Sequence, residues 1–95
     1  MSYVMINHKI ANYAKWKRVV KAASAWRKAS GEKSFYVCRN SKNPNDLMVW
    51  CEWDSAAGMQ KFMKSPELVK RMKEAGVIGK PEILFFNKME DLSVA

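Results

Sequence analysis

The stretch Asp46–Asp54, DLMVWCEWD, has the composition of a β-strand at the centre of a sheet. Successive side chains of a strand point to opposite faces. One face of this strand carries Leu47, Val49, Cys51 and Trp53, and the other carries Met48, Trp50 and Glu52. A strand that is covered on one face only alternates apolar with polar residues, and this stretch does not. The strand therefore has to be covered twice, and a chain of 95 residues is too short to do this alone.

Two strands and a long helix are predicted before this stretch. Tyr3–Lys9 and Lys33–Asn40 are rich in β-branched and aromatic residues, which favours strands. Between them, Asn12 is placed to cap a helix over Tyr13–Ser30, and Gly31 can close that helix in a left-handed conformation.

The second helical region, after the central strand, is predicted to be split in two. Asp54 or Ser55 caps a first short helix. Ser65-Pro66-Glu67 supplies the cap, the proline and the acidic residue that typically begin a second helix, and Gly76 ends it. Glu82–Met89, EILFFNKM, is the last strand and is apolar on both faces.

The element order is β-α-β-β-α-β, which predicts an α+β, ferredoxin-like sandwich in one domain over residues 1–95. Its four-stranded antiparallel sheet carries helices on one face only. The open face then shows Met48 and Trp50 with Phe35 and one of Phe85 or Phe86, more apolar surface than a monomer usually exposes. We therefore expect a homodimer, a dimeric α/β barrel, formed through the sheet face.

The hairpin Lys33–Asp54 turns at SKNPND. If the turn centres on Asn43–Asn45, Cys38 lies beside Cys51 and Arg39 becomes a neighbour of Glu52. The faces of the two strands would then combine as follows. Phe35, Val37 and Arg39 would share the face of Met48, Trp50 and Glu52, and Tyr36 and Cys38 would share the face of Leu47, Val49, Cys51 and Trp53. A slip of one residue would exchange these groupings.

The net charge is +8, and the segment Lys9–Gly31 contains no carboxylate but seven basic residues. Such a surface favours anionic partners, but a solvated helix face that keeps the protein soluble is a better explanation than a nucleic-acid site. The chain has no apolar run of membrane-spanning length and no signal-peptide pattern, so we expect no membrane association and a cytoplasmic location. One His and two Cys provide no recognisable metal-ligand set, and we expect neither a metal nor another cofactor.

Several stretches together resemble a known family. They are HKIANYAKWK (residues 8–17), RKASG (27–31), RNSKNPND (39–46), EWD (52–54), SPEL (65–68) and AGVIGKP (75–81). They are similar to the small dimeric α/β-barrel proteins of the antibiotic-biosynthesis-monooxygenase-like (ABM-like) and cyclase-like group. The resemblance implies the fold and the dimer, while activities in this superfamily differ widely.

Two branches of that group imply different chemistry. The haem-degrading branch pairs an Asn on the first strand with an iron-ligating His on a later helix. Asn7 matches the first, but His8 is the only His, so this branch is disfavoured. The cofactor-free, quinone-forming branch surrounds a phenolic substrate with aromatic, amide and basic side chains. This chain has those residue types but no alignment to that branch's catalytic positions.

The candidate site is the cleft between helices and sheet. There His8 could take a phenolic or enolic proton and Arg27 could stabilise the resulting oxyanion, while Tyr13, Trp16 and Trp53 could bind a flat ring. The simpler interpretation makes His8 a strand-end histidine and the aromatic residues ordinary core. Arg27 falls within the apolar arc of its helix, so it is either buried with a partner or extends past the sheet edge.

The sequence thus predicts an enzyme similar to a cofactor-independent monooxygenase or cyclase, acting on a planar aromatic, phenolic or polyketide-like substrate. A non-catalytic dimer that binds a small anionic or aromatic ligand, or that regulates another protein, is the alternative. RNA binding is disfavoured because the third strand lacks the basic-Gly-aromatic pattern, and Glu52 on that strand would repel phosphate.

Overall fold

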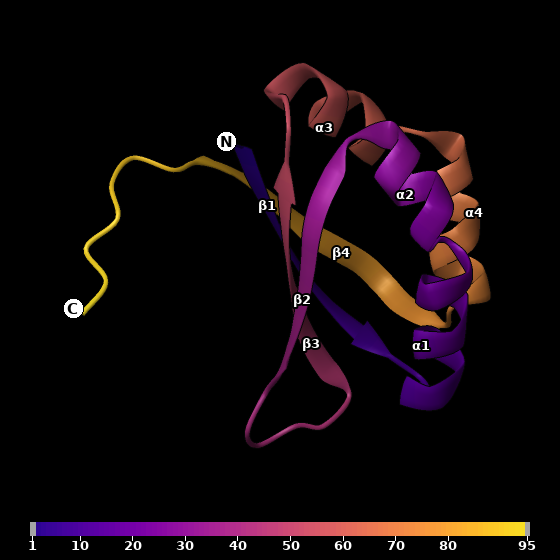
Figure 1. Ribbon diagram of the computed structural model, residues 1–95. Helices are drawn as coiled ribbons and strands as arrows, with labels where there is room; N and C mark the ends of the chain where they lie inside the picture. Colours follow the sequence, from indigo (N-terminus) through magenta and orange to yellow (C-terminus); the bar gives the residue numbers. More distant parts are fainter. Residues whose placement is uncertain (1, 95) are drawn as a thin grey trace.

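The computed structural model describes residues 2–94. Four antiparallel strands form one sheet in the order β2-β3-β1-β4, and the helices cover one of its faces (Figure 1). The elements along the chain are β1 (Ser2–Ile10), α1 (Tyr13–Ala22), α2 (Ser24–Ser30), β2 (Glu32–Arg39), β3 (Asp46–Trp53), α3 (Ala56–Met63), α4 (Pro66–Glu74) and β4 (Val77–Asn87). The predicted α+β, ferredoxin-like arrangement is therefore confirmed.

The central strand β3 lies between β1 and β2, and one of its faces forms the core with the helices. Leu47, Val49, Cys51 and Trp53 are each at most 2% exposed. Strand β1 contributes Val4, Ile6 and His8 to the same side, as predicted from its alternation. The predicted division of β3 into two faces is thus correct.

The predicted register of the β2–β3 hairpin is wrong. Phe35 lies opposite Cys51, Val37 opposite Val49 and Arg39 opposite Leu47. These three residues of β2 therefore share the helix-covered face rather than the open one. Cys51 had been expected opposite Cys38, so the register differs by three residues, and an odd shift exchanges the faces.

The loop explains this difference. The side-chain oxygen of Asn40 accepts hydrogen bonds from the backbone N–H groups of Lys42 (2.8 Å) and Asn43 (3.1 Å). The N–H of Asn40 donates to the Asp46 carbonyl at 2.9 Å, and the N–H of Asp46 donates to the Asn43 carbonyl at 3.1 Å. These contacts centre the turn on Asn43, because asparagine side chains readily organise local turns. The turn therefore centres on the first residue of the expected range Asn43–Asn45 and not on its middle.

The corrected register separates residues that were expected to be neighbours. Arg39 lies over the ring of Tyr13, 4.9 Å from its centroid, and not beside Glu52. Glu52 instead accepts a hydrogen bond of 2.7 Å from the Tyr3 hydroxyl on the open face. Cys38 is exposed and Cys51 is buried, on opposite faces of the sheet.

The helix predicted over Tyr13–Ser30 is interrupted at Ala23, which separates α1 from α2. Ala23 has φ −89° and ψ 0°, outside the regular helical range. Both predicted ends are confirmed. The Asn12 side chain accepts from the Lys15 N–H, and Gly31 has a left-handed φ of +114°.

The predicted split of the second helical region is confirmed. The hydroxyl groups of Ser55 and Ser65 accept hydrogen bonds from the first turns of α3 and α4. Gly76 follows α4 with a φ of +81°. Strand β4 begins at Val77, earlier than the predicted Glu82, and its pairing with β1 contains a register shift.

The open face of the sheet carries apolar side chains from several strands. Tyr36, Trp50, Leu84 and Phe86 are between 42% and 64% exposed. Phe86 is thus the β4 aromatic residue on this face, whereas Phe35 is not part of it. The segment after β4 runs out on the side of the sheet away from the helices (Figure 1). Within residues 2–94, no helix is both long and apolar enough to span a membrane.

Candidate functional site

A cavity of about 80 Å³ lies between the helices and the covered face of the sheet. Most of its lining is apolar, from β1, β2, β3, the start of β4 and all four helices. Four residues with ionisable side chains other than cysteine take part in the lining, and they are His8, Arg27, Glu32 and Arg71. A mostly apolar hollow with few polar groups has the composition of a small-molecule site.

His8 reaches the cavity from β1 and is 7% exposed. Its Nδ1 atom is buried and has no hydrogen-bond partner in the part of the chain that the structure describes. Burial lowers the pKa of His8 below its ordinary value, and the Ile6 backbone and Asp46 carboxylate offset only part of this effect. The imidazole is therefore neutral near pH 7, and one of its nitrogens can accept a proton.

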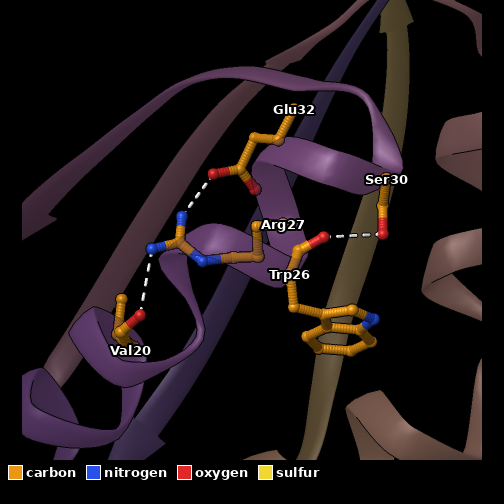
Figure 2. A network of polar contacts seen from close by, with 5 residues as sticks. All are labelled: Val20, Trp26, Arg27, Ser30 and Glu32. Atoms are coloured by element: carbon orange, nitrogen blue, oxygen red, sulfur yellow. Dashed lines mark hydrogen bonds and ion pairs between the residues drawn. The ribbon is translucent and has the colours of Figure 1, made fainter.

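Arg27 is buried with a partner, which decides between the two interpretations of its sequence position. One terminal nitrogen of its guanidinium donates to a Glu32 carboxylate oxygen, and the other donates to the Val20 carbonyl at 3.0 Å (Figure 2). The Arg27 and Glu32 side chains are 13% and 7% exposed. The Nε atom of Arg27 is buried and has no partner among residues 2–94. Arg27 therefore keeps one free donor at a cavity that it lines.

The break at Ala23 helps to position this guanidinium. In a continuous helix the Val20 carbonyl would accept from the backbone N–H four residues later. Here it accepts from the Ala23 N–H at 3.2 Å and from Arg27. The side chain of Arg27 thus ties the end of α1 to the first residue of β2.

Aromatic side chains connect His8 with Arg27. The Trp16 ring lies 5.8 Å from His8 and 6.4 Å from Phe35, measured between centroids. The guanidinium of Arg27 lies over the Phe35 ring, 4.4 Å from its centroid. Tyr13 stacks on Trp16 at 5.7 Å but is not part of the cavity lining. Aromatic rings therefore line the cavity from His8 to the guanidinium of Arg27.

Trp53 lies elsewhere in the core. It is fully buried and contacts Phe62 with a centroid distance of 4.8 Å, and Phe62 in turn packs on Trp26 at 4.5 Å. Trp53 does not line the cavity, although its Nε1 atom is buried without a partner in the described chain. Arg71 of α4 covers Trp26 at 4.6 Å from the ring centroid.

The structure thus brings together three of the five predicted site residues, His8, Trp16 and Arg27, around one cavity. Tyr13 and Trp53 lie outside the lining, and the roles predicted for all five stay predictions. Sequence reasoning missed Glu32 and Phe35. Glu32 did carry a signal, because it is the first carboxylate after the acid-free segment 9–31.

The charges at the site nearly cancel. Burial raises the pKa of Glu32, and the Arg27 charge opposes this rise. Burial also raises the pKa of the Cys51 thiol, so Cys51 is a protonated core residue and not a nucleophile. Among the described residues, no three His, Cys, Asp or Glu side chains come together as they would around a metal ion. The available chemistry is proton transfer at His8 and hydrogen bonding by Arg27.

Solved structures with the same fold were found across nearly the whole chain. One of them is a mutant of SnoaB, a cofactor-independent oxygenase from Streptomyces nogalater. It has a TM-score of 0.74 at 13% identity, and the alignment covers 96% of this chain and 95% of that chain. A monooxygenase from the ActVA-Orf6 gene of Streptomyces coelicolor, bound to nanaomycin D, has a TM-score of 0.70 at 14% identity, with 99% and 92% covered. An antibiotic biosynthesis monooxygenase has a TM-score of 0.69 at 10% identity, with 95% and 100% covered.

No family model matches the sequence, and no curated protein matches it either. At these identities the structural similarity establishes the fold. The resemblance to ABM-like proteins is therefore confirmed at the level of the fold. The reaction has to be argued from the site itself.

Proposed function

We propose that this protein is a cofactor-independent enzyme, similar to the monooxygenases or cyclases of this fold, that acts on a planar phenolic substrate in the helix–sheet cavity. One observation carries the proposal. A neutral histidine and a buried arginine with a free Nε donor line the same apolar cavity. A base and an oxyanion stabiliser are the two groups that ionisation of a phenol or enol requires.

The oxygenation balances without a cofactor. His8 takes the phenolic proton, and the imidazolium that forms balances the charge of the phenolate, whose oxygen accepts a hydrogen bond from Nε of Arg27. The electron-rich ring carbon then forms a bond to O2, and cleavage of the O–O bond leaves a second carbonyl on the ring and releases water. A phenol and O2 thus give a quinone and H2O, with all the electrons supplied by the substrate. In a cyclase, His8 would take a proton to form an enolate, whose carbon would bond to a carbonyl carbon of the same substrate; the carbonyl π bond would break, and its oxygen would take the proton back from His8.

The cavity has to widen for this substrate. An engineered apolar cavity of about 150 Å³ binds benzene, whereas this one measures about 80 Å³. Met63 and Met72 belong to its lining and are only partly buried. Methionine side chains adapt readily, so their movement is the simplest way to admit a ring.

The proposal includes a homodimer formed through the open face of the sheet, in a cytoplasmic protein. The exposed aromatic and aliphatic side chains on that face, including Tyr36, Trp50 and Phe86, support it. Light scattering at micromolar concentration should give twice the chain mass, and Trp50→Glu should halve it. A monomeric wild-type protein contradicts this part of the proposal and leaves the cavity chemistry intact.

A screen of phenols by thermal shift and oxygen consumption tests the enzymatic proposal. A ligand at one hundred times its dissociation constant adds about 2.7 kcal/mol to the free energy of unfolding, or roughly 11–22 °C in Tm for a chain of this size. His8→Gln should lower oxygen consumption at least about a hundredfold. Lys17→Ala, on the exposed surface of α1, is the matched control and should change nothing.

A non-catalytic ligand-binding dimer is the second candidate, favoured by the mostly apolar lining of the cavity. It predicts thermal shifts without turnover by any phenol. Turnover that survives unchanged in His8→Gln would contradict the proposed catalytic role of His8.

A further inference from the structure

We infer that Glu32 is a specificity-determining residue of the cavity: by cancelling the charge of Arg27 it makes the site select neutral rings over anionic ones. This inference rests on the proposed function, because it assumes that the cavity takes an aromatic ligand. It narrows the sequence-based expectation of a small anionic or aromatic ligand to an uncharged aromatic one. It also assigns a role to a residue that the proposed chemistry leaves unused.

The first observation is the enclosure of the pair. Glu32 lines the cavity together with Arg27, and its side chain is 7% exposed. At such a depth solvent screens charge poorly. A ligand carboxylate that entered would therefore meet a nearly neutral ion pair, and it would lose its own hydration without a matching cation.

The second observation concerns the other cation at the cavity. Arg71 donates from Nε to the Glu67 carboxylate at 2.9 Å and lies over the Trp26 ring. Its side chain is 31% exposed, so solvent already screens its charge, with or without Glu67. The remaining ionisable lining group, His8, is neutral near pH 7. The buried part of the lining thus offers donors without a net positive charge.

The third observation is geometric. Glu32 and the Val20 carbonyl engage both terminal nitrogens of the guanidinium, and Nε remains free. A guanidinium has five N–H groups, and these two bonds take one on each terminal nitrogen. A ligand carboxylate that sought a bidentate clamp would therefore compete with Glu32 and Val20 for the terminal nitrogens. The Nε–H belongs to the nitrogen that has no partner among residues 2–94, and it suits a single oxygen atom, such as that of a phenol, an enol or a ketone.

Substitutions that change charge and keep shape test the inference. Glu32→Gln keeps an oxygen acceptor for Arg27 and leaves the guanidinium charge uncompensated. Arg27→Gln leaves the carboxylate charge, and the double substitution removes both. The probes are phenol, benzoate and benzylammonium, three single rings that are neutral, anionic and cationic at pH 7. Dissociation constants come from titration calorimetry at fixed ionic strength.

Wild-type protein should bind phenol at least tenfold more tightly than either charged ring. Glu32→Gln should shift the phenol-to-benzoate ratio at least tenfold toward benzoate, and Arg27→Gln should shift preference toward benzylammonium. The double variant should return to the neutral preference of the wild type. A purely structural role for Glu32 would not restore the phenol-to-benzoate ratio in the double variant. This ratio can still be measured if one of the single variants folds poorly.

The outcomes separate the two proposals. An unchanged phenol-to-benzoate ratio in Glu32→Gln, with phenol still bound, overturns the role of Glu32 and leaves the proposed function standing. Absence of binding by every ring to the wild-type protein overturns both. Glu67→Gln, which alters the exposed partner of Arg71, is the matched control and should leave the ratio within twofold of wild type.

Discussion

Replacement of Arg27 by Met should be among the most destabilising single substitutions in this chain. It would leave the Glu32 carboxylate buried, at 7% exposure, without its cation. Breaking a buried pair in this way typically costs about 3–5 kcal/mol. A domain of this length has about 5–14 kcal/mol in total, at roughly 0.05–0.15 kcal/mol per residue. Loss of the bond from Arg27 to the Val20 carbonyl adds little to this cost, because the carbonyl still accepts the hydrogen bond from the Ala23 N–H.

Urea unfolding followed by tryptophan fluorescence measures this cost. Glu32→Met should destabilise by a similar amount, and the double substitution should cost less than either single one, because two buried charges disappear together. The exposed Glu67–Arg71 pair supplies the control cycle and should couple by less than about 0.5 kcal/mol. If each single substitution at the buried pair costs less than 1 kcal/mol and the costs simply add, the reasoning about its burial fails.

Three further measurements address separate parts of the molecule. Because burial lowers the pKa of His8, the unfolded chain binds more protons than the folded one below the ordinary value of 6.5, so stability should fall as pH drops through this window. His8→Gln should flatten that part of the curve of urea midpoint against pH, and a wild-type curve that is already flat would contradict the assignment. Iodoacetamide should spare Cys51 until urea is added, and it should modify Cys38 in the folded Trp50→Glu variant, in which no second copy covers the open face; mass spectrometry distinguishes the two sites. Gly31→Ala should cost at least about 1 kcal/mol, since φ is +114° and the new Cβ would lie 2.6 Å from a carboxylate oxygen, whereas Gly79→Ala, at φ +71° in open space, isolates the backbone strain.

The fold could be predicted from local patterns because each element carries its own signal. The alternation of β3 fixed its two faces, and the serine caps and Pro66 located the split helices. The break at Ala23 has no such signal. Nothing in the residues around Ala23 is a helix breaker, and the break is accompanied by a tertiary contact, the bond from Arg27 to the Val20 carbonyl.

The hairpin register failed for a related reason. Its loop offers several residues that favour turns, and composition alone does not say which of them organises the chain. In the structure Asn40 organises the turn, because its side-chain oxygen accepts hydrogen bonds from two backbone N–H groups of the loop. The consequence reaches the site, because the same register places Phe35 under Arg27 and leaves Tyr36 on the open face.

The candidate site was predictable in part. Helical periodicity placed Arg27 within the apolar arc, and a buried cation requires a partner. Searching for that partner among the nearest carboxylates would have led to Glu32, which lies just beyond the end of its helix. The strand alternation and helix periodicity could not predict that Tyr13 and Trp53 lie outside the cavity. Their exclusion depends on how Trp16 and Phe62 fill the space beside them.

The net charge of +8 and the neutral cavity act at different ranges. The exposed lysines and arginines of α1 and α2 produce a field that attracts anions from solution and accelerates their arrival. The cavity lies beneath those helices, where the Glu32 carboxylate cancels the charge of the buried Arg27 guanidinium. The association rate of benzoate should therefore fall as ionic strength rises, because salt screens exposed charges, whereas that of neutral phenol should not. The preference for phenol over benzoate should hardly change with salt, since the enclosed pair that sets it is screened far less. The basic surface thus affects how fast anions approach, and the buried Arg27–Glu32 pair determines which rings bind in the cavity.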